Sequence, residues 1–369
     1  MRWYKNIIIP AGLLSALIIG AGMFSLPFVF QKAGWLAGFF YLVAFSVVFS
    51  LIHLMYLAVI RQTKGNHRFV GYAKIYLGRF GFLSSILVTV FTIILVLTIY
   101  LILSVSFIRL ILPDFNSLAG VFAFWLLGTI AVILGIKKMA GIEFWTAVGM
   151  IFLVLVIFIS ALNLTDFNLK EIPAFSLPFW FLPFGPVLFS LAGRAAISSI
   201  NEYFEVNKLK KKGNIELAVI LGTVIPAIIY FLFVLGVFGF SPGLISPDAV
   251  SGMTAAPAII IKIIGILGIL SLLTSYIFLG LELKGIFHLD FKLPGIGAVL
   301  LVILAPIGLY LLGVADFIKA VSLAGGVFAG LEGAMVVLMY EKISGKRIFV
   351  YLLLPIFFLG ALYKVFQMF

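Results

Sequence analysis

The sequence contains no cysteine, only three histidines and only 13 acidic residues among its 369 positions. The absence of cysteine excludes disulfide bridges and thiolate metal sites. With so few histidines and carboxylates, no metal-ligand cluster and no nucleophile–base pair emerges, so we expect no enzyme. Charged residues make up 10% of the chain, which is too few for the surface of a soluble protein of this length.

Apolar residues dominate instead: 64% of the chain is hydrophobic and the mean hydropathy is +1.29. This composition indicates an all-α protein with many membrane spans, starting with a retained span rather than a cleaved signal peptide. Segments long enough to cross a bilayer, about eleven in all, lie at roughly 7–30, 36–60, 82–111, 119–136, 143–162, 178–203, 214–240, 258–281, 294–313, 317–340 and 348–367.

The net charge of +12 is distributed unevenly between alternate loops. If the N-terminus is inside, the inner face receives the basic residues Arg2, Lys5, Arg61, Lys64, Arg68, Lys74, Arg79, Lys137, Lys138, Lys208, Lys210, Lys211, Lys212, Lys284, Lys292, Lys342, Lys346 and Arg347. The outer face receives only Lys32, Arg109, Lys170, Lys262, Lys319 and Lys364. This bias predicts a multi-pass plasma-membrane protein with a cytoplasmic N-terminus and an external C-terminus. The expected partners of the basic residues are lipid headgroups, not nucleic acid.

Glycines interrupt the first apolar segment near its middle. Gly20 and Gly22 flank Ala21, and Pro27 follows. Glycine costs about 1 kcal/mol in a helix interior relative to alanine, so this stretch favours unwinding. Unwound backbone within a membrane is tolerated only where it is buried in protein or lines a cavity, and broken helices of this kind mark the binding sites of transporters.

The sixth segment has a comparable pattern. Pro183, Gly185 and Pro186 come early, and Ser190-Leu191-Ala192-Gly193-Arg194 lies at its middle. Each of these two segments is the first span of a five-span half of the chain, the first half at about 7–162 and the second at about 178–340. An extra helix follows at about 348–367, and we expect all of these segments to form one domain over 1–369. Because five is odd, the halves have opposite orientations, which predicts an inverted repeat with two discontinuous helices meeting at the midplane. The alternative is that Gly20, Gly22 and Gly193 only allow close helix packing.

Each break exposes two electrostatic poles. The N–H groups of Ala21 and Gly22 would carry partial positive charge, and carbonyls near Ile18 and Phe189, with the Ser190 hydroxyl, would supply the negative pole. A zwitterion with a carboxylate and an ammonium a few ångströms apart fits this pair. The sequence therefore predicts a site for a small zwitterionic substrate.

A second group of oxygens lies on the eighth segment, where Ser271, Thr274 and Ser275 share one helix face. Hydroxyls and carbonyls suit a small hard cation such as Na⁺, and carbonyls around Ala16 and Ile19 could complete its shell. The alternative is that these hydroxyls bond back to helix carbonyls.

The two interrupted segments carry a family resemblance. GAGMFSLPFVFQKAGW (20–35) resembles the G-x-G-x-x-x-LP-x-x-F-x-x-AGW signature of the amino acid/auxin permease family, within the amino acid–polyamine–organocation superfamily. LFSLAGRAAISSI (188–200) is similar to the sixth-span motif of that family. The resemblance implies the leucine-transporter (LeuT) fold, five plus five inverted spans with one extra, and secondary transport of amino acids driven by Na⁺ or H⁺.

The resemblance also implies roles for individual residues. Ala21 and Gly22 match carboxylate-binding amides, Ser190 a position near the substrate ammonium, and Tyr100 an aromatic hydroxyl beside the carboxylate. Ala16, Ile19, Ser271, Thr274 and Ser275 match a sodium site. Two positions depart from relatives: Met23 and Ala16 each stand where some of them carry an asparagine that serves sodium. The Asp-Pro-Gly motif of the metal-transporting branch is missing.

The remaining candidates concern specificity and gating. The apolar residues Met23, Val96, Phe189 and Leu191 near the breaks suggest a neutral, hydrophobic substrate, although they could simply pack. Three charged residues are candidates for gating or coupling: Arg194 near mid-membrane, Glu332 in the tenth segment, and Asp316 at its outer end, which could equally be a solvated cap.

Together these features predict a symporter that moves neutral amino acids with Na⁺ by alternating access and needs no organic cofactor. Three alternatives remain open: coupling to H⁺, another solute such as a nucleobase or polyamine, and a membrane sensor that binds an amino acid without moving it. The sequence gives no oligomeric state.

Overall fold

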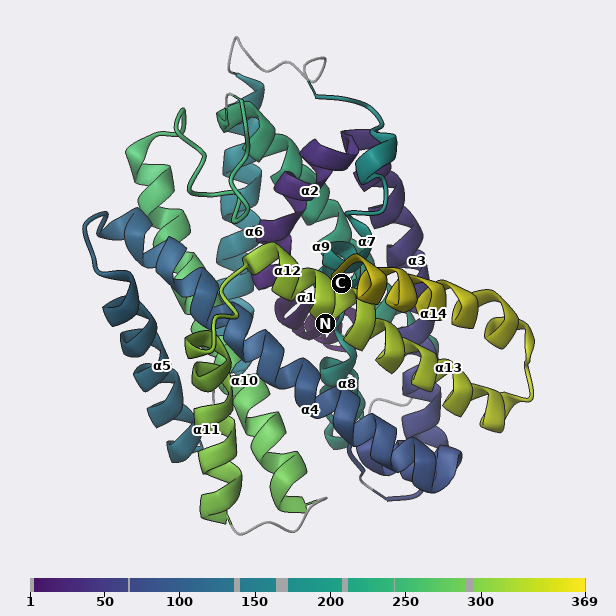
Figure 1. Ribbon diagram of the computed structural model, residues 1–369. Helices are drawn as coiled ribbons and strands as arrows, with labels where there is room; N and C mark the ends of the chain where they lie inside the picture. The colour runs from purple at the N-terminus through teal and green to yellow at the C-terminus, as the bar shows by residue number, and fades with distance from the viewer. Residues whose placement is uncertain are drawn as a thin grey trace.

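The computed structural model describes residues 3–65, 67–135, 140–163, 172–207, 212–241, 243–289 and 295–368. Within these ranges all regular secondary structure is helical (Figure 1). The α-helices are α1 (Ile9–Ile18), α2 (Leu26–Ala33), α3 (Trp35–Gln62), α4 (Phe69–Ile111), α5 (Ser117–Leu134), α6 (Ala140–Leu162), α7 (Phe184–Leu191), α8 (Arg194–Val206), α9 (Lys212–Phe240), α10 (Ala258–Leu289), α11 (Gly295–Leu311), α12 (Phe317–Leu323), α13 (Gly330–Ser344) and α14 (Ile348–Met368). Short π-helical turns, η1 (Tyr4–Ile8) and η5 (Ala324–Ala329), and 3₁₀ turns, η2 (Ala21–Ser25) and η4 (Leu177–Phe179), join or extend them.

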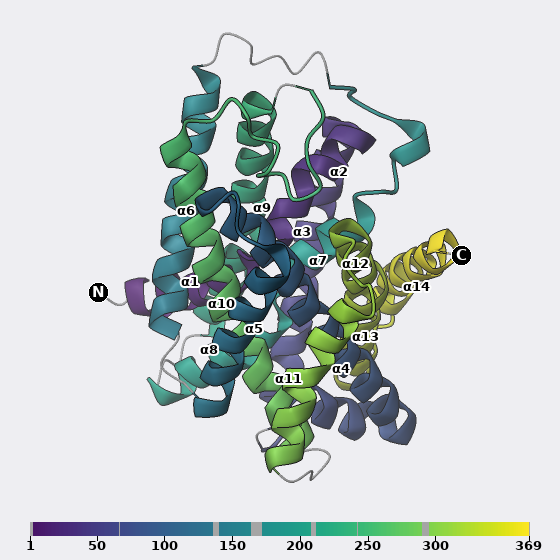
Figure 2. The same ribbon diagram turned by 60° about the vertical axis from the view of Figure 1, so that its left-hand side comes forward.

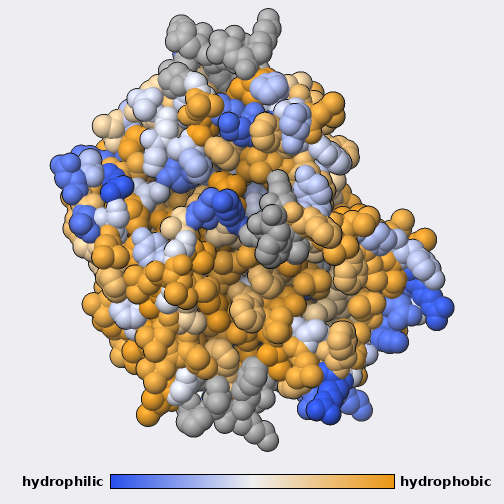
Figure 3. All heavy atoms as spheres, in the orientation of Figure 1, coloured by the Kyte–Doolittle hydropathy of each residue, from blue (hydrophilic) through white to orange (hydrophobic). Residues whose placement is uncertain are grey.

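The outer surface of the helical bundle is apolar over its middle. Figure 3 shows a broad hydrophobic surface over the middle and lower part of the visible face, with hydrophilic residues gathered in its upper part and at its lower right. Large side chains such as Phe40 (65% exposed), Phe152 (68%) and Leu359 (66%) point outwards. So much exposed apolar surface is unfavourable in water and is accounted for by a lipid surround.

Every predicted apolar segment falls on helical structure, but the number of spans is not settled by length. Among the residues that the structure describes, seven helices are long and apolar enough to cross a membrane, and the bent pair Tyr4–Ile18 and Ala21–Ala33 makes an eighth. The sixth predicted segment is split into α7 and α8, and the apolar parts of α11 and α14 are shorter. Eleven spans therefore remain a prediction. Several basic residues behind the predicted topology lie outside the described residues: Arg2, Lys137, Lys138, Lys170, Lys208, Lys210, Lys211 and Lys292.

The interrupted first span lies within the bundle. α1 packs against α9 and α6, and α3 contacts α9 and α8. The long helix α4 crosses the molecule obliquely and packs along α10 and α11 (Figures 1 and 2). Gly78, with a φ of +69°, bends α4 near its start, a conformation that glycine adopts without a steric penalty.

The first half of the sixth segment is held by the π-helical turn of the tenth. α7 packs closely against η5, and a Cβ added to Gly325 would overlap the carbonyl of Gly185. Only glycine therefore fits at position 325. This contact fixes α7, and with it the second break, against the helix that continues as α13.

Candidate functional site

The first span is broken directly after α1. The helix ends at Ile18, and the next two residues, Ile19 (φ −72°, ψ 88°) and Gly20 (φ −146°, ψ −149°), leave the helical region. Helical turns resume at Ala21, and the two halves are bent by 48°. The interruption leaves the last carbonyls of α1 and the first N–H groups of η2 without helical partners.

The sixth segment is broken in the same manner. α7 ends at Leu191, Ala192 has an extended ψ of 104°, Gly193 has φ −124° and ψ 14°, and α8 starts at Arg194. Both predicted discontinuities are therefore confirmed.

The two breaks are in direct contact. A Cβ added to Gly22 would lie 2.6 Å from Cα of Ser190, and one added to Gly193 would lie 2.6 Å from Cγ1 of Ile18. No real Cβ tolerates such distances, so both glycines are needed for the approach. The glycines thus interrupt the helices and also permit close packing; the two readings of the sequence are compatible.

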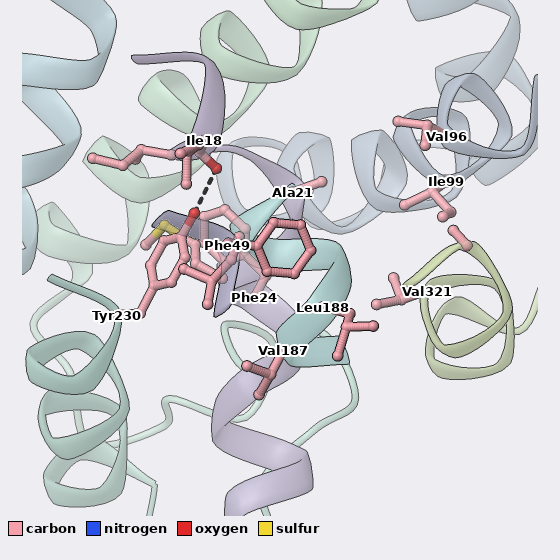
Figure 4. Close-up of a cluster of buried hydrophobic side chains, with 14 of the residues drawn as sticks. Ile18, Ala21, Phe24, Phe49, Val96, Ile99, Val187, Leu188, Tyr230 and Val321 are labelled. Carbon is pink, nitrogen blue, oxygen red and sulfur yellow. Dashed lines mark hydrogen bonds between the residues drawn. The ribbon is translucent and has the colours of Figure 1, made fainter. Parts of the chain in front are cut away.

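The carbonyl groups at the ends of α1 and α7, which form the negative pole of the site, point towards one side chain. The hydroxyl of Tyr230, on α9, donates to the carbonyl of Ile18 and lies 3.0 Å from the carbonyl oxygen of Ser190 (Figure 4). The Ser190 hydroxyl donates to the Pro186 carbonyl at 2.7 Å, and the Phe189 carbonyl accepts from Ala192 N–H at 3.3 Å. The carbonyls of Ile18 and Ser190, rather than that of Phe189, therefore form this pole, because the last turn of α7 closes on Phe189.

The N–H pole is open. Within the described residues, the backbone N–H groups of Ala21 and Gly22 have no hydrogen-bond acceptor. Ala21 is 2% exposed and Gly22 is buried. Buried N–H groups without a partner are rare and costly, so this pair calls for an anionic or carbonyl ligand.

A histidine holds the second break. The N–H of Gly193 donates to Nε2 of His53 at 3.3 Å, and Nδ1 of His53 lies 2.9 Å from the hydroxyl oxygen of Thr223. The Thr223 hydroxyl donates to the Val219 carbonyl, so Nδ1 must be the donor to Thr223 and the ring is neutral. His53 is fully buried and connects α3, α9 and the start of α8.

One of the three predicted hydroxyl ligands of the cation, Ser275, lies near the first break. Ser271, Thr274 and Ser275 on α10 are all buried, at 5%, 3% and 2% exposure. A Cβ added to Gly20 would lie 4.0 Å from the Ser275 hydroxyl, so α10 reaches the break. Thr274 donates to the Ser271 carbonyl at 3.0 Å, as the packing alternative expects for that residue. The carbonyls of Ala16 and Ile19 accept no hydrogen bond from the described residues.

The apolar candidates line the same region. Met23 and Leu191 are completely buried, Tyr100 and Val96 on α4 are each 7% exposed, and Phe189 is half-buried. Ala192 is exposed, so the second break is reached from outside the core at this residue. Figure 4 shows Phe24 inside this apolar cluster, and its ring packs edge-on against Phe107 and Phe233 at centroid distances of 4.8 and 5.4 Å.

Arg194 forms a buried ion pair at the start of α8. Its Nε and Nη2 donate to the two carboxylate oxygens of Glu332 at 2.9 and 3.1 Å, and both side chains are 12% exposed. The guanidinium also lies over the ring of Phe69, 4.2 Å from its centroid. The pair joins α8 to α13. Asp316 is exposed and caps α12 by accepting from Lys319 N–H at 2.9 Å, as the solvated-cap alternative expects.

Sequence reasoning missed Tyr230 and Thr223 in this region and did not place Glu282 here. Tyr230 and Thr223 lie on one apolar helix and carry no local signal. Glu282 on α10 is buried, and its Oε2 has no hydrogen-bond partner among the described residues. Only the helix packing brings Glu282 within electrostatic reach of Arg194, Arg68 and Glu332.

Solved structures of transporters share this architecture. MhsT in complex with L-phenylalanine is 15% identical, with a TM-score of 0.61 over 95% of this chain and 98% of that one. The Eremococcus coleocola manganese transporter in complex with an aromatic bis-isothiourea compound is 14% identical, with a TM-score of 0.64 over 99% and 86%. Mhp1, a nucleobase-cation-symport-1 family transporter, is 11% identical, with a TM-score of 0.63 over 97% and 90%. The protein therefore has the LeuT fold, which these transporters use.

The family follows from the sequence. The profile of the transmembrane amino acid transporter proteins matches residues 11–278, which include both breaks, α9 and most of α10. The chain belongs to this family. No protein of curated function matches it.

Proposed function

We propose that the protein is a symporter that carries neutral, hydrophobic amino acids together with Na⁺ across the plasma membrane by alternating access. One observation supports the substrate class above others. At the contact between the two breaks, the unpartnered N–H groups of Ala21 and Gly22 lie beside the converging carbonyls of Ile18 and Ser190. An amino acid offers a carboxylate to the first pair and an ammonium to the second, without any ionised side chain.

The apolar surroundings support a neutral side chain. Met23, Leu191 and Phe24 are buried at the breaks, and no carboxylate lies among these residues to balance a cationic side chain. A charged side chain would have to be desolvated here without a partner, which is unfavourable. MhsT, whose structure contains L-phenylalanine, supports a hydrophobic substrate by analogy of fold alone.

The Na⁺ proposal rests on the oxygens beside the first break. The free carbonyls of Ala16 and Ile19 and the hydroxyls of Ser271, Thr274 and Ser275 are uncharged hard oxygen donors, which suit an alkali cation. Bound there, the ion would neutralise the negative end of α1 and stabilise one arrangement of the break. The competing coupling ion, H⁺, would need a carboxylate; Glu332 is held by Arg194, whereas Glu282 has an oxygen without a partner among the described residues.

The proposal of alternating access is supported by the ion pair that connects an interrupted helix, α8, to α13. In this proposal the first repeat spans about 7–162 and the second about 178–340 of one domain, with the N-terminus inside and the C-terminus outside. Spans 1, 2, 6 and 7 would rock against the remainder. The Arg194–Glu332 pair links the moving α8 to α13 and must separate for one side to open.

The test is ligand binding by the purified protein, measured as thermal stabilisation by each of the twenty amino acids in NaCl and in choline chloride. We expect a few neutral amino acids to raise the melting temperature, and only with Na⁺. A Gly22→Ala variant, whose new methyl group meets Ser190, should lose the shift, while Gly308→Ala, which meets nothing within 4 Å, should keep it. Equal shifts in both salts would contradict Na⁺ coupling and favour H⁺. No shift for any amino acid would contradict the substrate class.

A further inference from the structure

One hydroxyl occupies the point at which the carbonyls of both broken helices converge. Tyr230 is completely buried, and its oxygen lies between the Ile18 carbonyl of the first break and the Ser190 carbonyl of the second. Figure 4 shows the ring reaching from α9 towards the end of α1. No other side chain of the described residues donates to either carbonyl.

A hydroxyl satisfies this position only in part. It carries one proton, so it can donate fully to only one of two carbonyl oxygens. Both carbonyls stand at helix C-termini, where the partial negative charge favours a cation. An ammonium group has three protons and a positive charge, and it would satisfy both carbonyls better than the phenol does.

We propose that Tyr230 occupies, in the substrate-free protein, the position that the substrate's ammonium takes, and that the two groups compete for the Ile18 and Ser190 carbonyls. This inference rests on the proposed function and assigns Tyr230 a role in specificity. The ammonium of a ligand displaces the Tyr230 hydroxyl and donates hydrogen bonds to the carbonyls of Ile18 and Ser190 in its place. A carboxylic acid without an ammonium leaves the hydroxyl in place and gains nothing from the carbonyls.

The same contact holds the two breaks together when no substrate is bound. Tyr230 connects the end of α1 to the end of α7 through α9, so its displacement removes this hydrogen-bonded link between the two half-helices. Tyr100, on α4, lies within electrostatic reach of Tyr230. Substrate binding would therefore rearrange the polar groups at the breaks as well as fill the site.

The experiment compares Tyr230→Phe with the wild type in affinity for L-leucine and for 4-methylpentanoate, the same molecule without the ammonium. We expect the variant to bind L-leucine about 3- to 10-fold more tightly, the range of one removed hydrogen bond to a competing donor, and to bind 4-methylpentanoate as the wild type does. Tyr276→Phe is the matched control, because Tyr276 is equally buried and its hydroxyl has no partner in the described structure. Weaker L-leucine binding by Tyr230→Phe, or an equal change for both ligands, would overturn the proposal.

A second measurement does not depend on amino acid binding. Methylammonium chloride should raise the melting temperature of Tyr230→Phe more than that of the wild type, because its N–H groups replace the lost donor. Tetramethylammonium chloride, which has no N–H group, should not. If methylammonium acts selectively but no amino acid binds, the proposed function fails and the assignment of Tyr230 stands. If L-leucine binds the wild type and methylammonium has no selective effect, the assignment of Tyr230 fails and the proposed function stands.

Discussion

Removing one partner of the Arg194–Glu332 pair should destabilise the protein far more than removing a surface ion pair. Glu332→Gln leaves the guanidinium, 12% exposed and bonded at 2.9 and 3.1 Å in the wild type, without its counter-charge. An uncompensated buried charge costs about 3–5 kcal/mol. Because the glutamine still offers one oxygen acceptor, we expect about 3 kcal/mol. Arg194→Met should cost a similar amount, since it leaves the Glu332 carboxylate unpaired.

The double variant distinguishes the ion pair from general damage to packing. In Arg194→Met/Glu332→Leu neither charge of the pair is left without its partner, so the loss should be smaller than the sum of the two single losses by about 2–3 kcal/mol. Glu341→Gln is the surface control: the Arg347–Glu341 pair lies at 3.5 Å with Arg347 74% exposed, and its loss should cost less than about 1 kcal/mol. The assay is reversible denaturant unfolding in detergent. Additive losses in the double variant, or a control that costs as much as Glu332→Gln, would refute this reasoning.

Three further predictions concern the breaks. Gly22→Ala should abolish L-leucine binding measured by calorimetry, because the new methyl group meets Ser190 at 2.6 Å; unchanged affinity would show that the breaks do not form the site. His53→Leu should destabilise the protein by about 1–3 kcal/mol in thermal unfolding, because it leaves the Gly193 N–H without an acceptor. His53→Gln should recover part of that loss. Equal stability of the two variants would contradict the hydrogen-bonding role of His53. Thr274→Val with Ser275→Ala should lower the apparent Na⁺ affinity for stimulating L-leucine binding by about tenfold, about 1.4 kcal/mol. Ser84→Ala, a half-buried hydroxyl on α4 that bonds back to the Phe80 carbonyl, should not lower it. Equal Na⁺ responses would remove the α10 hydroxyls from the cation site.

The interrupted helices could be predicted from the sequence because their cause is local. Gly20, Gly22 and Gly193 disfavour a helix wherever they stand in one, and an apolar run long enough to span a membrane is recognisable without any knowledge of its neighbours. The positions of both breaks were therefore predictable to within a few residues.

The partners of the breaks could not be predicted in this way. Tyr230 and His53 lie in long apolar helices, and their hydrogen bonds to Ile18, Ser190 and Gly193 depend on how α9 and α3 are turned against α1 and α8. A one-residue rotation of either helix would point these side chains elsewhere, and no local pattern fixes that rotation.

Charged residues show the same limit. Arg194 and Glu332 were each recognisable as intramembrane charges, but 137 residues separate them in the chain. Only the packing of both α8 and α13 against α3 makes them a pair, with the guanidinium over Phe69.

Uptake of radiolabelled L-leucine into proteoliposomes with an inward Na⁺ gradient tests the central claim most directly. The account predicts accumulation by the wild type and by Gly308→Ala, no accumulation by Gly22→Ala, and loss of accumulation when choline replaces Na⁺. Absence of uptake by the wild type, or equal uptake by Gly22→Ala, would contradict it.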